Sequence, residues 1–205
     1  MSSNEEHWTA IYLRHRANQL SWFQAKPTCS LGLIESAGLA RSDPILDVGG
    51  GTSLLVDHLL DRGYRDVTVL DLAVPALDAV RARLSPRNQT VTLLHADLAH
   101  FTPQRRYGLW HDRAVFHFLT STQDRRSYLR ALVASLRPGG HVVIGTFAPD
   151  GPPRCSGLDV VRYEPSALAA TLGPRFALVR MERELHVTPT GVVQPFQYSL
   201  FRAAG

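Results

Sequence analysis

The chain has 205 residues, 44% of them hydrophobic, and a formal net charge of +4, which is the composition of an ordinary globular protein. No apolar run approaches the roughly 18 residues of a membrane-spanning helix, and the acidic N-terminus is not that of a secretory signal. Lys26 is the only lysine and the arginines are scattered, so no basic run indicates a nucleic-acid partner.

We expect one domain over residues 1–205, with an N-terminal helical cap over residues 1–43 and a core over residues 44–205. Cys29 and Cys155 could form one bridge. A low cysteine count without a signal peptide fits better the reducing cytoplasm, where we expect the protein. The sequence does not indicate an oligomeric state.

Strand and helix patterns alternate after residue 44. Strands are predicted at 45–48, 67–70, 91–94, 107–110, 141–147, 176–187 and 193–202. The longest predicted helix opens with a capping box at Ser121 and ends at Pro138–Gly140, and the turn Thr188–Gly191 joins the last two strands as a hairpin. This order predicts an α/β fold, a Rossmann-like doubly wound sheet of seven strands with the last strand antiparallel.

A glycine turn directly follows the first predicted strand. The segment reads Asp47-Val48-Gly49-Gly50-Gly51-Thr52-Ser53. Glycine lets the backbone approach a ligand closely, because no Cβ intervenes. A helix capped by Thr52 or Ser53 would point free N–H groups at a carboxylate or a phosphate. The turn therefore predicts a ligand cradle, although such a turn alone is a weak signal.

Acidic residues recur where the predicted parallel strands end. Asp47, Asp71, Asp97 and Asp112 all lie at or near the carboxyl end of a strand. Ligands of doubly wound sheets bind outside those ends, at the point where the strand order reverses. We therefore expect the four acids to share one edge of the sheet and to form a binding site there.

With these features the chain resembles the class I methyltransferases that use S-adenosylmethionine, from about Trp8 to the C-terminus. The segment Asp47–Gly51 resembles the family's first motif, an acid followed by alternating glycines, although Ser53 replaces the third glycine. The segment Leu136–Gly140 resembles the turn that commonly precedes the family's fifth strand. The resemblance implies transfer of a methyl group from S-adenosylmethionine, with S-adenosylhomocysteine as the product.

The resemblance also implies roles for residues after the second and third strands. Asp71, followed by Leu72, matches the acid that binds the ribose hydroxyls. Asp97, followed by Leu98, matches the segment that faces the adenine. The chemistry fits independently, because a carboxylate accepts two hydroxyl protons better than a neutral side chain does.

The N-terminal aromatic residues narrow the resemblance. Trp8, Tyr12, Trp22 and Arg113 match positions around the cofactor in a bacterial group with Trp-His-Asp-Arg after strand four, and in lysine methyltransferases of elongation factor 1A or citrate synthase. Asp112-Arg113-Ala114-Val115 departs from the Asp-Lys-Gly-Thr of the lysine-modifying relatives. The acceptor is therefore not carried over from them.

The donor's other groups also have candidate partners. The turn at Gly49 and Gly51 suits the donor's carboxylate, and Asp47 suits its ammonium group. Aromatic faces such as those of Tyr12 and Trp22 suit a cationic sulfonium, at roughly 0.5–2 kcal/mol each. Packing of an N-terminal helix is an equally good interpretation of each aromatic residue.

A general base is needed only if the nucleophile arrives protonated. The candidates are His111, Asp112 and His117, which follow or end the fourth strand. His117 lies in an apolar segment, which favours a buried structural role, and Asp112 suits ordering of the cofactor or the loop. No metal is expected, because the cysteines lack zinc spacing and the histidines are dispersed.

Several alternatives stay open from the sequence. An NAD-dependent oxidoreductase shares the glycine turn, but Leu54 stands where its fingerprint requires a glycine. A non-catalytic S-adenosylmethionine-binding module on the same fold is a second alternative. Methylation of nucleic acid is disfavoured, since residues 111–114 do not resemble the Asn- or Asp-Pro-Pro-aromatic turn. A small-molecule acceptor is favoured over a protein lysine, because little chain remains for a recognition domain.

Overall fold

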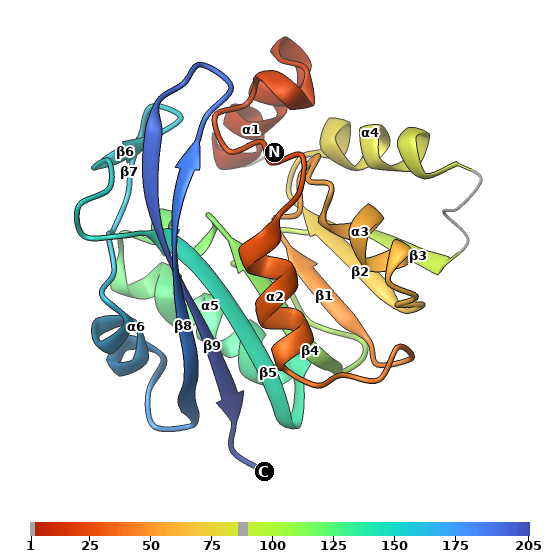
Figure 1. Ribbon diagram of the computed structural model, residues 1–205, viewed down its shortest axis with the longest axis vertical. Coiled ribbons are helices and arrows are strands. Elements are labelled where there is room, and N and C mark those ends of the chain that lie inside the picture. The colour runs from red at the N-terminus through yellow and green to blue at the C-terminus, as the bar shows by residue number, and fades with distance from the viewer. Residues whose placement is uncertain (1–2, 86–89) are drawn as a thin grey trace.

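A computed structural model describes residues 3–85 and 90–205 and contains a central seven-stranded sheet (Figure 1). The strands lie in the order β3-β2-β1-β4-β5-β9-β8. Their bounds are β1 Ile45–Val48, β2 Val67–Asp71, β3 Val91–His95, β4 Tyr107–Arg113, β5 Leu136–Phe147, β8 Phe176–Val187 and β9 Val193–Ala203. β9 runs antiparallel to both of its neighbours, which confirms the predicted seven strands and the antiparallel last strand.

Helices cover both faces of the sheet, because its central strands carry buried apolar side chains on both sides. α2 (Thr28–Ser36), α3 (Leu55–Asp61) and α4 (Val74–Leu84) bury apolar residues on one face. α5 (Thr122–Ser135) and α6 (Pro165–Leu172) do so on the other. α1 (Ser3–Arg14) lies above the carboxyl ends of the strands, at the top of Figure 1.

The reversal of strand order lies between β1 and β4. The chain runs outward from β1 through β2 to β3 and then returns to place β4 on the other side of β1. Asp47 on β1 lies opposite Val69 of β2 and His111 of β4. All four strands are parallel, so their carboxyl ends open a crevice at one edge, where ligands of this fold bind.

Three local elements differ from the prediction. α3 begins at Leu55 and its N-cap is Leu54 rather than the predicted Thr52 or Ser53, although the Ser53 hydroxyl still accepts a hydrogen bond from the Leu55 N–H at 3.1 Å. β5 begins at Leu136, where its register against β4 shifts. A small hairpin of β6 (Arg154–Cys155) and β7 (Leu158–Asp159) occupies the loop after β5. The described residues also include the 3-10 turns η1 (Ala17–Gln19) and η3 (Phe116–Phe118).

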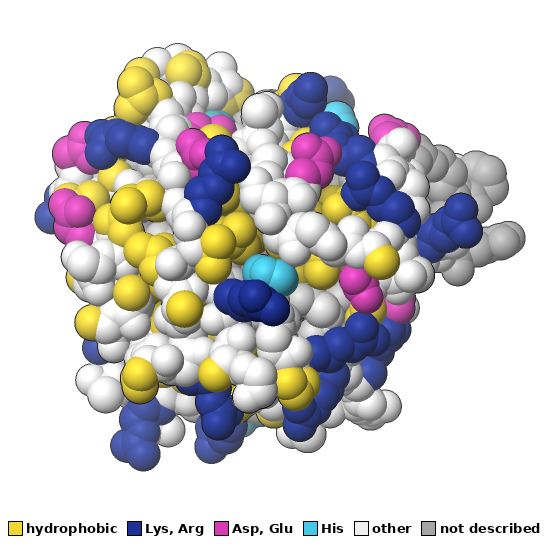
Figure 2. Space-filling model, turned by 60° about the horizontal axis from the view of Figure 1, so that its bottom comes forward, with side chains coloured by type: hydrophobic (Ala, Val, Ile, Leu, Met, Phe, Trp, Pro, Cys, Tyr) yellow, Lys and Arg dark blue, Asp and Glu magenta, His cyan; other side chains and the backbone are white. Residues whose placement is uncertain are grey.

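Basic side chains gather on the face that carries the amino ends of the strands. Figure 2 brings this face forward and shows Lys and Arg side chains along its lower edge. Arg106, Arg137 and Arg175 surround a depression there.

Within residues 3–85 and 90–205, no helix is long and apolar enough to cross a membrane. Cys29 and Cys155 are both free thiols.

Candidate active site

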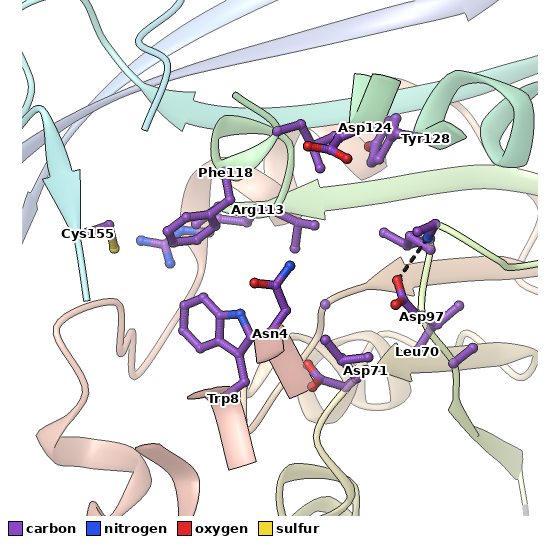
Figure 3. A pocket seen from close by; sticks show the side chains of 18 of the residues that line it. Asn4, Trp8, Leu70, Asp71, Asp97, Arg113, Phe118, Asp124, Tyr128 and Cys155 are labelled. Atoms are coloured by element: carbon purple, nitrogen blue, oxygen red, sulfur yellow. Dashed lines mark hydrogen bonds between the residues drawn. The ribbon is translucent and has the colours of Figure 1, made fainter. Parts of the chain in front are cut away.

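A cleft of about 210 Å³ opens where the carboxyl ends of β1 to β4 meet, beneath α1. Most of the residues predicted to hold a cofactor line it: Trp8, Tyr12, Trp22, Gly49, Asp71, Leu72, Asp97, Leu98 and Arg113. In Figure 3, Asp71 and Asp97 lie at one end, Cys155 lies at the other, and Trp8, Phe118 and Arg113 lie between them. The structure thus brings together side chains that are far apart in the sequence.

The glycine turn is closely covered by neighbouring side chains. Gly49 and Gly51 have φ angles of 60° and 52°, which favour glycine. A Cβ on Gly49 would lie 2.1 Å from the side chain of Val115, and one on Gly51 would lie 2.2 Å from the Tyr12 hydroxyl. No larger residue fits at either position, because Val115 and Tyr12 pack against the turn; Gly49 lines the cleft, whereas Gly51 lines neither cavity.

Asp71 is a buried carboxylate that orders this turn. Its Oδ2 accepts a hydrogen bond from the Gly51 N–H and its Oδ1 accepts one from the Ala73 N–H, both at 2.8 Å. Burial raises the pKa of Asp71 to about 6, although these bonds favour the charged form. A carboxylate oxygen has room for more than one donor, so Asp71 can accept further hydrogen bonds from a ligand.

The end of β3 supplies the second acid of the cleft. Asp97 Oδ1 accepts the Ala99 N–H at 2.9 Å, a bond drawn in Figure 3, and this fixes the local turn. Leu72 and Leu98 add apolar surface to the same part of the cleft. Two acids beside apolar side chains suit a ligand with polar edges and a flat apolar body.

The N-terminal cap supplies aromatic walls. The Trp8 and Trp22 rings meet edge to face with centroids 5.8 Å apart, and Tyr12 meets Trp22 in the same manner at 6.2 Å. Trp8 also packs against Phe118 of η3 at 5.1 Å. α1 buries no residue completely, so its aromatic side chains cover the cleft rather than fill the core.

A smaller cavity of about 40 Å³ adjoins the cleft at Trp22, Gly49 and Arg113. Asp47 and His111 also line it. His111 donates from Nδ1 to Asp47 Oδ1 at 2.7 Å, and its Nε2 lies 2.9 Å from the Ser30 hydroxyl. Asp47 thus lies beside the cleft rather than in it. Both ring nitrogens of His111 already have partners, one of them the unpredicted Ser30.

Arg113 lies between the two cavities and is held on three sides. Its Nε donates to the Tyr198 hydroxyl at 2.8 Å and its Nη1 donates to the carbonyl of Trp22 at 2.9 Å. The guanidinium lies 4.5 Å above the centre of the Phe196 ring. Nη2 is buried and has no hydrogen-bond partner within the described residues. A buried, unsatisfied N–H at a cavity wall fits an anionic group of a ligand.

Asp112 is fully buried below the loop that follows β4. It accepts hydrogen bonds from the Val115 N–H at 3.0 Å, the Phe116 N–H at 3.1 Å and the Tyr128 hydroxyl at 2.7 Å. Burial raises its pKa to about 6. These bonds pin the loop that walls the cleft, so its surroundings favour an ordering role over that of a base.

His117 is completely buried and does not line the cleft. Its ring packs against Phe118 and Phe147, with centroids 4.5 and 4.9 Å away, and its Nδ1 faces the Phe147 N–H at 3.4 Å. Burial lowers its pKa to about 3, which keeps the imidazole neutral at physiological pH. These surroundings favour a structural role, and the catalytic assignment stays a prediction.

Sequence reasoning missed several residues of the cleft. Asn4 reaches it from α1, and Asp124 and Tyr128 reach it from α5. The helical pattern of α5 assigns Tyr128 to the core, and nothing in the sequence singles out Asn4. Cys155 lies in the loop expected to border an acceptor, and it does line the cleft. Within the described residues, no group of three or more His, Cys, Asp or Glu side chains is placed to hold a metal ion.

Solved methyltransferases share this fold at low sequence identity. One similar protein was studied for the conversion of a disulfide bond into a thioacetal group during echinomycin biosynthesis. It has a TM-score of 0.79 and 22% identity, and the match covers 98% of this chain and 93% of that one. A second is the 1,6-didemethyltoxoflavin-N1-methyltransferase of Burkholderia thailandensis, solved with S-adenosylhomocysteine. Its TM-score is 0.73 at 21% identity, with 99% of this chain and 85% of that one covered.

A third similar structure is the N-methyltransferase NodS of Bradyrhizobium japonicum WM9 in complex with S-adenosylhomocysteine. Its TM-score is 0.73 at 19% identity, with 96% of this chain and 98% of that one covered. At this identity the likeness establishes the fold. A comparison with curated protein sequences finds no match.

The family model described as a methyltransferase domain matches residues 45–140, the segment from β1 into the start of β5. Over these residues the chain carries a methyltransferase domain, and the whole chain has the fold of solved methyltransferases that bind S-adenosylhomocysteine. The alternative of an NAD-dependent oxidoreductase is not favoured by these findings.

Proposed function

We propose that the protein transfers a methyl group from S-adenosylmethionine to a small-molecule acceptor, with the donor bound in the cleft at the carboxyl ends of β1 to β4. The observation that carries this proposal is the order of groups along the cleft. The buried Asp71 and the partly exposed Asp97 lie at one end, and the glycine turn and the unsatisfied N–H of Arg113 lie beyond them. These are the partners that an adenosyl group and an amino-acid group require.

The adenosyl part of the donor suits the end of the cleft with the two acids. In this proposal Asp71 accepts hydrogen bonds from the ribose hydroxyls through its free lone pairs. Asp97 accepts one from the exocyclic amine of the adenine. The apolar side chains of Leu72 and Leu98 contact the ring, which buries its flat faces.

The amino-acid part of the donor suits the smaller cavity and its junction with the cleft. Arg113 Nη2 donates to the carboxylate, since it is buried there without another partner. Asp47 and the backbone of Gly49 face the ammonium side. Trp22 and Tyr12 offer aromatic faces to the sulfonium, each worth roughly 0.5–2 kcal/mol. Gly51 contributes by keeping the turn free of side-chain bulk.

When bound, the donor supplies an electrophilic methyl group on a positively charged sulfur. The protein's residues then contribute by orientation, which accounts for roughly 7–11 kcal/mol where reacting groups are well aligned. The aromatic cap of Trp8 and Phe118 excludes water from the same part of the cleft. The roles of His111, Asp112 and His117 as bases stay predictions, and this proposal does not require them.

The acceptor would enter at the end of the cleft that Cys155, Phe118 and Trp8 line (Figure 3). The aromatic and thiol side chains at this end suit a small molecule with an apolar body. Two of the similar structures are N-methyltransferases by name, so amines are the first acceptors to examine. A protein lysine is the second candidate, and nucleic acid is disfavoured.

We also propose that the chain belongs with the bacterial group that carries the Trp-His-Asp-Arg motif, which here forms the last four residues of β4 rather than following the strand. Each residue of this motif has a distinct partner here. Trp110 donates to the Tyr128 hydroxyl at 2.8 Å, and Asp112 accepts from that hydroxyl. His111 pairs with Asp47, and Arg113 pairs with Tyr198. These contacts give a physical reason to keep the four residues together.

The free thiols of Cys29 and Cys155 support a reducing cytoplasm as the location that we propose. The division into a cap over residues 1–43 and a core over residues 44–205 is part of the same proposal. It is supported by the position of α1 above the strand ends and by the start of β1 at Ile45.

Two measurements test the proposed function. S-adenosylhomocysteine should raise the unfolding temperature of the purified protein, whereas NAD should leave it unchanged. With a radiolabelled methyl donor, a panel of small amines should become labelled in preference to host proteins or RNA. Stabilisation by NAD alone would contradict the donor assignment, and label appearing only in protein or RNA would contradict the acceptor class.

A further inference from the structure

We propose that Tyr198 and Glu184 of the C-terminal hairpin are positioning residues that aim Arg113 at the carboxylate of the methyl donor. This inference rests on the proposed function. Tyr198 and Glu184 line neither the cleft nor the smaller cavity. They would act on the donor only through Arg113.

A continuous hydrogen-bonded chain links the hairpin to the site. Arg113 Nε donates to the Tyr198 hydroxyl at 2.8 Å. That hydroxyl donates to Glu184 Oε2, also at 2.8 Å. The phenol thus accepts from a cation and donates to an anion, which fixes the direction of both bonds. Burial raises the pKa of the Tyr198 hydroxyl, so it keeps the proton that it donates.

The loop before α2 contacts both ends of this hydrogen-bonded series, Glu184 and Arg113. Gln24 Nε2 donates to the other oxygen of Glu184, Oε1, at 2.7 Å. The carbonyl of Trp22 accepts from Arg113 Nη1 at 2.9 Å. The same loop therefore holds Arg113 and the carboxylate that orients it. Trp22, which lines both cavities, is fixed by the same contacts.

Packing around Tyr198 and Arg113 fixes the geometry of these hydrogen bonds. A Cβ on Gly145 would lie 2.7 Å from the Tyr198 ring, so glycine on β5 allows the phenol to approach the sheet closely. Phe196, two residues away on β9, supports the flat face of the Arg113 guanidinium. Nε and Nη1 each already donate to a partner, and Nη2 is the one guanidinium nitrogen that is buried without any partner among the described residues. A guanidinium held in this orientation binds a carboxylate more tightly, because little side-chain conformational entropy is lost when the ligand binds.

Two ligands that differ in the amino-acid group separate this role from a general effect on folding. S-adenosylhomocysteine has a carboxylate, whereas 5′-methylthioadenosine retains the adenosyl group and lacks that carboxylate. For Tyr198→Phe, which keeps the ring against Gly145, we expect about tenfold or greater loss of affinity for the first ligand by calorimetry. Its affinity for the second should stay within about twofold of the wild-type value.

Two further variants should lose affinity for S-adenosylhomocysteine to different extents. Arg113→Lys should show a loss as large as that of Tyr198→Phe, again only for S-adenosylhomocysteine, since the planar fork is gone. Glu184→Gln should show a smaller loss, because the amide oxygen still accepts from Tyr198. Glu182→Gln is the matched control, since Glu182 lies on the same strand and pairs with the exposed Arg180. It should bind both ligands as the wild type does.

The outcomes distinguish the inference from the function on which it rests. If the wild-type protein binds neither ligand, the proposed function fails. If it binds both, and Tyr198→Phe retains its affinity for S-adenosylhomocysteine, the positioning role is wrong. A similar loss for both ligands would also overturn it, because the substitution would then have disturbed the whole cleft.

Discussion

At the scale of single residues, Asp71 combines two tasks that ordinarily fall to different side chains. Its two oxygens hold the backbone N–H groups of Gly51 and Ala73, and this fixes the turn on which a ligand would rest. The same oxygens face the cleft. Because burial raises its pKa to about 6, the charge of Asp71 changes near physiological pH, and donor binding should depend on pH in the same range.

Asp71→Asn should lower the affinity for S-adenosylhomocysteine by roughly tenfold or more, because the amide offers one acceptor in place of two. In the wild type, protonation of Asp71 removes acceptor capacity, so affinity should fall as pH drops through about 6. The variant should lack this step. Asp78→Asn, on the exposed surface of α4, is the control. Equal affinities for Asp71→Asn and the wild type at pH 7.5 would refute the ribose assignment.

The sequence predicts the place of a site residue well where its position relative to a strand is enough to locate it. Asp71 and Asp97 end parallel strands, so their place at the crevice follows from the strand pattern. The sequence is less informative for His111, because residues from distant segments surround its ring. Ser30 on α2 and Asp47 on β1 occupy both of its ring nitrogens. No local pattern near position 111 indicates either contact.

At the scale of elements, α1 is a cover rather than a part of the core. It has no fully buried residue, yet it carries Trp8 and Tyr12 into the cleft. Its other described contacts are with α4 and with His95 at the end of β3, which lies 3.3 Å from Glu5. The helix therefore depends on the strand ends, whereas the sheet does not depend on the helix.

Deletion of residues 1–14 should lower the unfolding temperature by only a few degrees, because little apolar surface of α1 is fully buried. Affinity for S-adenosylhomocysteine should fall by about tenfold or more with the loss of two aromatic faces. Calorimetry and thermal unfolding measure the two effects separately. Leu13→Ala, in the same helix with 70% of Leu13 exposed, should change neither. Full affinity in the truncated protein would show that the cap does not contact the donor.

The boundaries of elements were harder to predict than their existence. The seven strands follow from alternation of apolar runs and turn residues. The late start of α3 at Leu55 does not, because the glycine turn extends past Thr52, whose carbonyl accepts from Arg83 at 3.2 Å. That arginine lies on α4, and no pattern in the turn itself reveals the contact. β6 and β7 have two residues each, too short for a periodicity to be visible.

At the scale of the whole molecule, buried ionisable groups make stability depend on pH in opposite directions. Asp71 and Asp112 have raised pKa values of about 6, so each destabilises the fold fully above that pH, and this penalty disappears as pH falls from about 6 toward the ordinary value of 3.8. His117 has a pKa of about 3 in the fold against an ordinary value of 6.5. Between pH 6.5 and 3, His117 is therefore protonated in the unfolded chain and neutral in the folded chain. The free energy of unfolding consequently decreases as pH falls through this range.

His117→Gln isolates the histidine's part of this dependence. The variant should be less stable than the wild type at pH 7.5, by about 1–3 kcal/mol, because ring packing is lost. Its deficit should shrink as pH falls from about 6.5 toward 4, since the wild type alone suffers the protonation of His117. Denaturant unfolding at several pH values measures the difference. A deficit that does not change with pH would mean that the imidazole is not held neutral in the fold.

The most direct test of the central claim is a crystal structure of the protein grown with S-adenosylhomocysteine. We expect the ligand in the cleft beneath α1, with its ribose at Asp71, its adenine beside Asp97 and its carboxylate at Arg113. Density for the ligand at another place on the molecule, or an empty cleft at saturating ligand, would contradict the account.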